Sequence, residues 1–339
     1  RTILCLVALG ATIGMSAGSQ ADTGKRLIER YECNRCHSVP GVKPAPIEKH
    51  CVGCHQSIHD GSYFAAKDVL ARWRANNTSL REVPSLNGLK GRFRRQWIKD
   101  FLLDPHDIRP RLDASMPRLI ISPAHAAAIA RYLAPGRRVQ PLAPGGDAVR
   151  GRALFGQKGC GVCHQFTGAP LSTSEFNLDL TDKRIARGLK MAPDLRYTRM
   201  RMQPGAALAQ IKSPYEGSGP SPMPDIQMTE SEALDIAVWV LNAPLATDAG
   251  RAVVSRLAPL SRKVTYDEVS ARVFKKVCWH CHSEPDYASG DGGPGNTGGF
   301  GFAGRRINFS DEVAVNSGGR DRKGVRRSLF KPLPGQEDP

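Results

Sequence analysis

The chain has 339 residues, a length that accommodates two or three domains of ordinary size. Aromatic residues make up only 6% of it, whereas glycine and proline number 34 and 25, so the chain has little material for one large protein core. The formal net charge of +16 favours acidic partners. The sequence contains no nucleic-acid recognition motif, which argues against nucleic acid as a partner.

Residues 1–21 have the pattern of a secretory signal peptide. A basic first residue precedes an apolar run over residues 3–13, and a small-residue cleavage sequence ends at Ala21. An uncleaved anchor is the alternative, although the apolar run is short for a membrane span. No later stretch is long and apolar enough to cross a membrane. We therefore expect a periplasmic or otherwise exported protein that is soluble after cleavage or associated with a membrane complex.

Four copies of Cys-x-x-Cys-His follow, and they use every cysteine except Cys5, which lies in the expected leader. Two cysteines about one helical turn apart can form thioethers to one porphyrin, and the histidine that follows can bind its iron. A zinc knuckle or a redox dithiol would explain the paired cysteines, but not a histidine at the next position every time. We expect four covalent haem c groups, attached through Cys33 and Cys36, Cys51 and Cys54, Cys160 and Cys163, and Cys278 and Cys281, with iron bound by His37, His55, His164 and His282.

Three of the four motifs share a lead-in sequence. Residues 24–28, 151–155 and 270–274 each precede the first cysteine by eight or nine residues and read as amphipathic helices that run into the haem site. The motif at Cys51 lacks such a helix and follows a proline-rich loop over residues 39–46.

Two of these repeats continue in parallel. Each has a proline-containing segment, then an apolar segment, a Met-Pro pair and a closing helix. In the first repeat these are Pro84, 97–102, Met116 and Pro123–Leu133. In the second they are Pro193, 207–211, Met223 and Ser231–Leu241. Ser122 is the expected N-cap of the first closing helix, and Thr229 with Glu232 forms a capping box at the second.

On these motifs the chain resembles the class I cytochrome c family in its bacterial multihaem form, over nearly all of residues 22–245 and again from about residue 264. The resemblance implies a mainly α fold: tandem cytochrome c-like helical domains wrapped around covalent haems, with Gly/Pro-rich loops and little strand. It also implies that Pro84 and Pro193 accept hydrogen bonds from His37 and His164 through their carbonyls. Met116 and Met223 are then the sixth iron ligands.

The spacing places the second haem motif inside the first domain. From His37 to Pro84 is 47 residues, which is 18 more than the 29 from His164 to Pro193, and the extra length contains the motif at Cys51. We therefore expect an inserted haem rather than a separate domain. The predicted divisions are a dihaem domain over 22–138, a monohaem domain over 139–250 and an incomplete C-terminal monohaem segment over 251–339.

Several sixth ligands stay open at this point. Met228 competes with Met223, but it stands at a helix start where core packing explains it. For the second haem we rank His59, then His106, then His50, and a bis-His site would have a lower potential than a His/Met site. No Met or His follows His282, so the fourth haem needs a ligand from elsewhere in the chain, from another chain, or from water.

The sequence predicts an electron carrier without catalytic residues. Its partners would be acidic redox proteins or membrane redox complexes of a respiratory or related chain, and other cytochrome subunits. One alternative is a haem oxidoreductase, peroxidase-like or sulfur-oxidising, with substrate at the fourth haem. Another is a haem-bearing subunit of a larger electron-conducting assembly.

Overall fold

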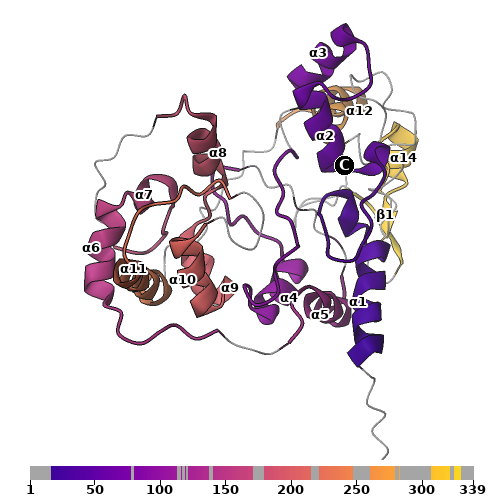
Figure 1. Cartoon of the computed structure of the whole chain (residues 1–339). Coiled ribbons are helices and arrows are strands. Elements are labelled where there is room, and N and C mark those ends of the chain that lie inside the picture. The colour runs from indigo at the N-terminus through magenta and orange to yellow at the C-terminus, as the bar shows by residue number, and fades with distance from the viewer. Residues whose placement is uncertain are drawn as a thin grey trace, which may run out of the picture.

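The computed structural model describes residues 17–77, 80–112, 116, 119, 121–136, 140–170, 179–214, 221–246, 260–278, 282, 307–320 and 324–329. The described part is mainly helical, as expected, and its strands are two residues long (Figure 1). None of the helices in these ranges has the length and apolar character needed to cross a membrane.

The first helical unit is built on a crossing of its first and last helices. Its helices are α1 (Ala17–Arg30), α4 (Arg95–Leu103) and α5 (Pro123–Leu133). A Cβ on Gly24 would lie 2.5 Å from Cβ of Tyr132, so glycine is required where α1 crosses α5. Ile28 of α1 and Ile129 of α5 are fully buried in one apolar cluster with Ile98 of α4.

The second helical unit repeats this crossing. It contains α6 (Ala148–Gln157), α7 (Cys160–Cys163), α8 (Lys183–Met191), η3 (Leu195–Tyr197), α9 (Thr198–Arg201), α10 (Pro204–Lys212) and α11 (Glu230–Asn242). A Cβ on Gly151 would lie 2.0 Å from the carbonyl oxygen of Asp235, so α6 and α11 also touch at a glycine. Phe155, Ile236 and Trp239 are buried in a separate apolar cluster.

The two expected closing helices are confirmed. The first closing helix begins and ends as predicted, and the Ser122 side chain accepts from the backbone N–H of His125 at 3.2 Å. The second closing helix is one residue longer at each end than predicted, and its capping box between Thr229 and Glu232 is present. The last residues of the expected leader, 17–21, lie in α1, and residues 1–16 are outside the described ranges.

The second cysteine motif lies on a helical pair that stands apart from the first unit's core. After η1 (Cys33–Arg35) and η2 (Ile47–Lys49), α2 (Cys51–Asp60) and α3 (Lys67–Asn76) project from the unit (Figure 1). Val52, Ile58 and Leu70 are buried, but they are not members of the apolar cluster beneath α1 and α5.

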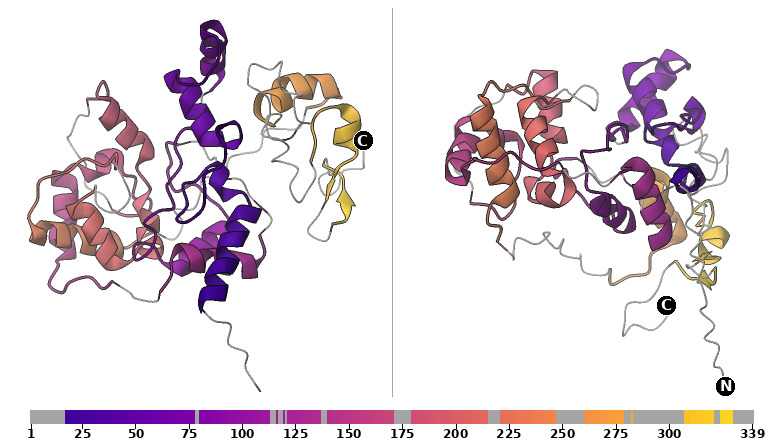
Figure 2. Two further views of the ribbon diagram at one scale, coloured as in Figure 1. Left: turned by 45° about the vertical axis from the view of Figure 1, so that its right-hand side comes forward. Right: turned by 60° about the horizontal axis from the view of Figure 1, so that its bottom comes forward.

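The C-terminal segment lies beside the first unit, on the side away from the second unit (Figure 2). Its lead-in helix runs through α12 (Tyr266–Val269) and a π-helical stretch, η4 (Ser270–Cys278), and the segment continues in α14 (Glu312–Asn316) and an antiparallel pair, β1 (Gly319–Arg320) with β2 (Arg326–Arg327). The ring of Phe274 stacks on Phe309 with centroids 4.5 Å apart. The five-residue α14 is much shorter than α5 or α11.

Backbone hydrogen bonds join the first two units. Phe93 and Met202 form an isolated antiparallel bridge. Beside it, Arg94 N–H donates to the carbonyl of Arg201 at 2.8 Å, and Gln203 N–H donates to the carbonyl of Arg92 at 2.7 Å. These bonds form a seam in which residues 92–94 pair with residues 201–203. The seam fixes α4 and the extended residues before it against α9 and α10.

Candidate haem-attachment sites

The structure brings two motif histidines to the prolines that the sequence paired with them. Nδ1 of His37 lies 2.8 Å from the carbonyl oxygen of Pro84, and Nδ1 of His164 lies 2.9 Å from that of Pro193. A carbonyl oxygen can only accept, so Nδ1 carries the proton in both rings. In the neutral ring Nε2 then has its lone pair available, which is the usual state of a metal-binding histidine.

Both histidines are held by the same local turn. His37 N–H donates to the carbonyl of Cys33 at 2.9 Å, and His164 N–H donates to that of Cys160 at 3.0 Å. One turn of helix therefore separates the first cysteine from the histidine in each motif. This geometry places two sulfurs and one imidazole on adjacent positions of one short segment.

Burial keeps these imidazoles neutral. It is the largest cause that lowers the pKa of His37, while the Pro84 carbonyl opposes it and Arg109 and His50 lower the pKa further. Burial also lowers the pKa of His164, against the Pro193 carbonyl. A ligand that needs a deprotonated Nε2 at neutral pH is favoured by both environments.

The described motif cysteines form no disulfide, and most have neutral thiols. Burial raises the pKa of Cys33, Cys54 and Cys160 to about 11 in each case. Cys51 differs, because a hydrogen bond with the Cys36 side chain is the largest cause that lowers its pKa to about 7. The first and second motifs therefore adjoin through their sulfurs, a contact that the sequence did not predict.

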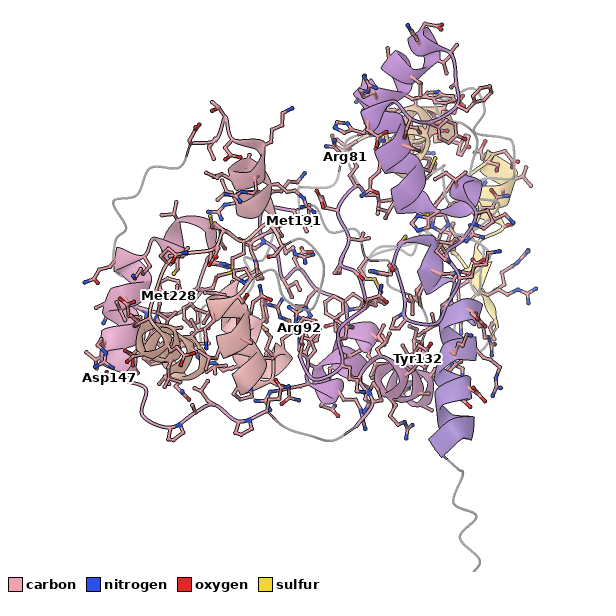
Figure 3. The ribbon with its side chains drawn as sticks, viewed as in Figure 1. Arg81, Arg92, Tyr132, Asp147, Met191 and Met228 are labelled. Atoms are coloured by element: carbon pink, nitrogen blue, oxygen red, sulfur yellow. The ribbon has the colours of Figure 1, made fainter. Side chains whose placement is uncertain are left out.

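Of the three candidate ligands for the second haem, two already have polar contacts on α2 or near it. His50 caps α2, with Nδ1 accepting from the N–H of Gly53 at 2.8 Å, which leaves its Nε2 for another partner. His59 is exposed, and its Nδ1 lies 2.8 Å from the guanidinium of Arg81, labelled in Figure 3. His55, the histidine of the attachment motif, is half-buried and lies on the same helix.

His106 occupies a different environment, at the boundary between the first two units. Its Nδ1 lies 3.1 Å from the carbonyl of Asp104, and its Nε2 is buried without a hydrogen-bond partner among the described residues. The ring packs between Phe101 and Tyr197, with centroids 5.3 and 5.0 Å away. An unpaired Nε2 fits a metal ligand, and the edge-on contact with Phe101 and the tilted contact with Tyr197 hold the ring in place.

The methionines separate into core and loop positions. Met116 is half-buried against the first apolar cluster, as is Cys33, and Met228 packs against the second (Figure 3). Met223 is half-buried in a loop, where its N–H donates to Oγ of Ser221 at 3.2 Å. Of the other methionines, Met191 and Met202 are buried, whereas Met200 is exposed.

The Met223 loop is fixed against α8. A Cβ on Gly188 would lie 2.8 Å from the carbonyl oxygen of Pro222, so the loop approaches the helix backbone closely. Since α8 leads directly to Pro193, the Met-Pro loop and the His164 carbonyl partner are held by the same helix.

The fourth motif shows the same histidine arrangement with a different partner. Nδ1 of His282 lies 3.1 Å from the carbonyl oxygen of Ile307, and Phe309 N–H donates to the carbonyl of His282 at 2.6 Å. Cys278 is half-buried, and Cys281 lies outside the described residues. The sequence did not predict Ile307, because any residue supplies a carbonyl and no proline marks this one.

The donor set fits a haem. Each motif offers thiols and an imidazole, and haem iron takes only two axial ligands. In the first unit the indole Nε1 of Trp97 is buried and has no acceptor among the described residues. Trp97 packs against the same apolar cluster as Cys33 and Met116. A bound group with an acceptor atom would complete such a site. Within the described ranges, no three His, Cys, Asp or Glu side chains gather as they would around a single metal ion.

Comparisons with protein-family models, with curated proteins and with solved structures find no match to this chain. The interpretation of these sites rests on the residues themselves.

Proposed function

We propose that the chain is an exported tetrahaem c-type cytochrome that transfers single electrons between redox partners of a respiratory or related chain. The observation that carries the proposal is the pair of contacts from His37 and His164 to the carbonyls of Pro84 and Pro193. A redox dithiol needs no histidine with Nδ1 fixed and Nε2 deprotonated. A zinc-bound histidine would have the same form, but a zinc site does not require a histidine directly after every cysteine pair.

The residues of the chain would hold and orient the cofactor. Cys33 with Cys36 and Cys160 with Cys163 would attach the porphyrins, while His37 and His164 would bind iron from one side. Met116 and Met223 are the proposed ligands from the other side. A bound haem supplies one-electron Fe(III)/Fe(II) chemistry, and a thioether ligand raises its reduction potential.

Contacts between the units support transfer from one haem to the next. Arg111 of the first unit donates from Nη1 to the carbonyl of Cys163 at 2.5 Å, and Arg109 donates from Nε to the carbonyl of Met191 at 3.1 Å. The side chains of Cys36 and Cys51 also touch. The first and second attachment motifs therefore touch each other, and the third contacts Arg111 of the first unit, which favours a relay.

The positive charge supports an acidic redox partner. With a net charge of +16, the chain would attract negatively charged surfaces over about one Debye length, roughly 10 Å at 0.1 M salt. The proposed partners are acidic redox proteins, membrane redox complexes or other cytochrome subunits, and association should slow as salt rises.

A haem oxidoreductase remains the second candidate because of one observation at the C-terminal end. No Met or His follows His282 in the sequence, so the fourth iron has no evident sixth ligand from its own segment. A high-spin ferric signal from that haem would favour substrate binding there. A neighbouring subunit that completes the segment would instead give a low-spin signal that is lost on dissociation.

The test is haem quantitation on cysteine-pair variants produced with a c-type haem maturation system. The wild type should contain four haems per chain by pyridine haemochrome, and C33A/C36A, C51A/C54A and C160A/C163A should each contain three. C5A is the matched control and should keep four, since Cys5 lies in the expected leader. Haem content that does not change in the pair variants would overturn the proposal.

A further inference from the structure

Three arginine side chains meet at the seam between the first two units. Arg92 and Arg201 lie over the same ring, with guanidinium carbons 5.6 and 5.5 Å from the centroid of Phe93. Arg109 reaches the same region and donates to the carbonyl of Met191. Figure 3 shows Arg92 and Met191 in the central region between the two units.

Arg201 is the most deeply placed of the three. Its residue is only 8% exposed, its Nε has no hydrogen-bond partner, and its guanidinium forms no hydrogen bond or ion pair with any described residue. Burial is the largest cause that lowers its pKa to about 10, and the charges of Arg109 and Arg92 lower it further. The other two arginines also have pKa values lowered mainly by burial.

The nearby carboxylates are already engaged. Glu82, whose charge acts on Arg109, forms a two-pronged ion pair with Arg187 at 2.8 and 3.0 Å. Both oxygens of Asp194 accept from Thr167, at 3.1 Å from its N–H and 2.5 Å from its hydroxyl. Within the described residues, the three arginines are therefore left without an ion-pair partner.

Buried cations without a counter-charge are costly. Each ion loses its hydration on burial, and like charges add repulsion. The π face of Phe93 offsets only part of this, since a cation–π contact is weaker than the hydration that it replaces. A bound anion would both neutralise the cluster and supply the acceptors that Arg201 lacks.

We propose that Arg92, Arg109 and Arg201 form an anion-binding site between the two helical units, and that it takes a carboxylate or a similar oxyanion. The site lies near both motif histidines, since Arg109 and Arg201 affect the pKa of His37 and His164 respectively. The inference rests on the proposed function in one respect, because haem carboxylates are then one source of the anion. A freely exchanging oxyanion is the other source.

The anion would fasten the two units together. Arg92 and Arg109 come from the first unit and Arg201 from the second, and Arg201 also belongs to the backbone seam through its carbonyl. An oxyanion that accepts from both sides would add to the backbone bonds at this junction. Loss of the anion would leave three mutually repelling cations there.

The experiment measures thermal unfolding of the haem-loaded protein over a series of inorganic phosphate concentrations at constant ionic strength. R201Q and R92Q are compared with R131Q, a control at an exposed position of α5. If the anion exchanges freely, the wild-type Tm rises with phosphate, R131Q behaves in the same way, and R201Q and R92Q lose the response.

If haem carboxylates fill the site, the wild-type Tm does not depend on phosphate. R201Q then lowers both the Tm and, severalfold, the equilibrium constant for reduction of at least one haem, because an uncompensated carboxylate favours ferric iron. A merely structural role would move the Tm and leave that equilibrium constant unchanged.

The proposal is overturned if phosphate has no effect on the wild type and the variants keep its redox equilibria. If the Tm of R201Q also equals or exceeds that of the wild type, the buried cations only destabilise the protein. Haem quantitation on the same samples separates this outcome from failure of the proposed function.

Discussion

His37 donates from Nδ1 to the carbonyl oxygen of Pro84 at 2.8 Å, although 47 residues and a second cysteine motif separate them. His164 makes the equivalent contact with Pro193 across only 29 residues. The two histidines therefore have equivalent carbonyl partners although the chain between histidine and proline differs in length by 18 residues.

The loop that carries Pro193 depends on Asp194. Its Oδ1 accepts from the N–H groups of Thr167 and Arg196, at 3.1 and 3.0 Å. Asp194→Ala should lower the free energy of unfolding by about 2 kcal/mol, since the donors on Thr167 and Arg196 lose the carboxylate that accepts from them. It should also broaden the EPR signal of one haem, because the His164 ring loses its fixed carbonyl. The control is Asp179→Ala, which removes a similar turn with Thr181 at an exposed position and should leave that signal unchanged.

Spectra of the proposed third haem would show whether Met223 or Met228 is its sixth ligand. We expect Met223→Ala to convert one low-spin ferric haem to high spin in low-temperature EPR and to lower its potential, as loss of an iron ligand requires. Met228→Ala should keep the spectrum and lower stability by about 1–2 kcal/mol, since Met228 packs against the second apolar cluster. The reverse pattern would assign the ligand to Met228. Met116→Ala should affect the first haem in the same way as Met223→Ala affects the third.

The glycine at each helix crossing sets how closely the helices pack. Gly151→Ala should destabilise the second unit by about 2 kcal/mol or more, because the added Cβ would lie 2.0 Å from the backbone of Asp235. Gly24→Ala should have a similar effect on the first unit. Urea unfolding followed by circular dichroism measures both. Val149→Ala, at an exposed position on α6, should stay within about 0.5 kcal/mol of the wild type.

Asp235 makes stability depend on pH in the acid range. It is 1% exposed, its Oδ1 accepts from Asp147 N–H at 2.8 Å, and it is ion-paired with Arg150. The hydrogen bond from Arg150 is the largest cause that lowers its pKa. A carboxyl with a lowered folded-state pKa stabilises the protein above its unfolded-state pKa, and this stabilisation is lost as the pH falls through the folded value. The wild-type Tm should therefore fall more steeply than that of Asp235→Asn between pH 5 and 3. Parallel curves would show that this pair does not contribute.

The sequence predicted those parts of the molecule that local chemistry determines. The helix over Pro123–Leu133 follows from its N-cap and apolar spacing, whereas the contacts of His37 and His164 with prolines were expected from the resemblance to class I cytochromes c. The partner of His282 was not predictable in this way, because Ile307 contributes only a backbone carbonyl.

Other features depend on tertiary packing that no local pattern encodes. Arg201 stands in a short polar stretch that reads as solvated surface, yet the seam with Arg94 buries it. Likewise, the contact between the Cys36 and Cys51 side chains arises from how the loop between them folds back. Both features lie where two segments that are distant in the sequence meet, and residue spacing does not predict such contacts.

The most direct test of the central claim is the intact mass of the protein produced with a c-type haem maturation system and freed of loosely bound cofactor by acid-acetone. The account predicts a mass that exceeds the polypeptide by four haem groups, with a haem-stained band that survives denaturing electrophoresis. A mass equal to that of the polypeptide alone, with eight motif thiols open to alkylation, would contradict it.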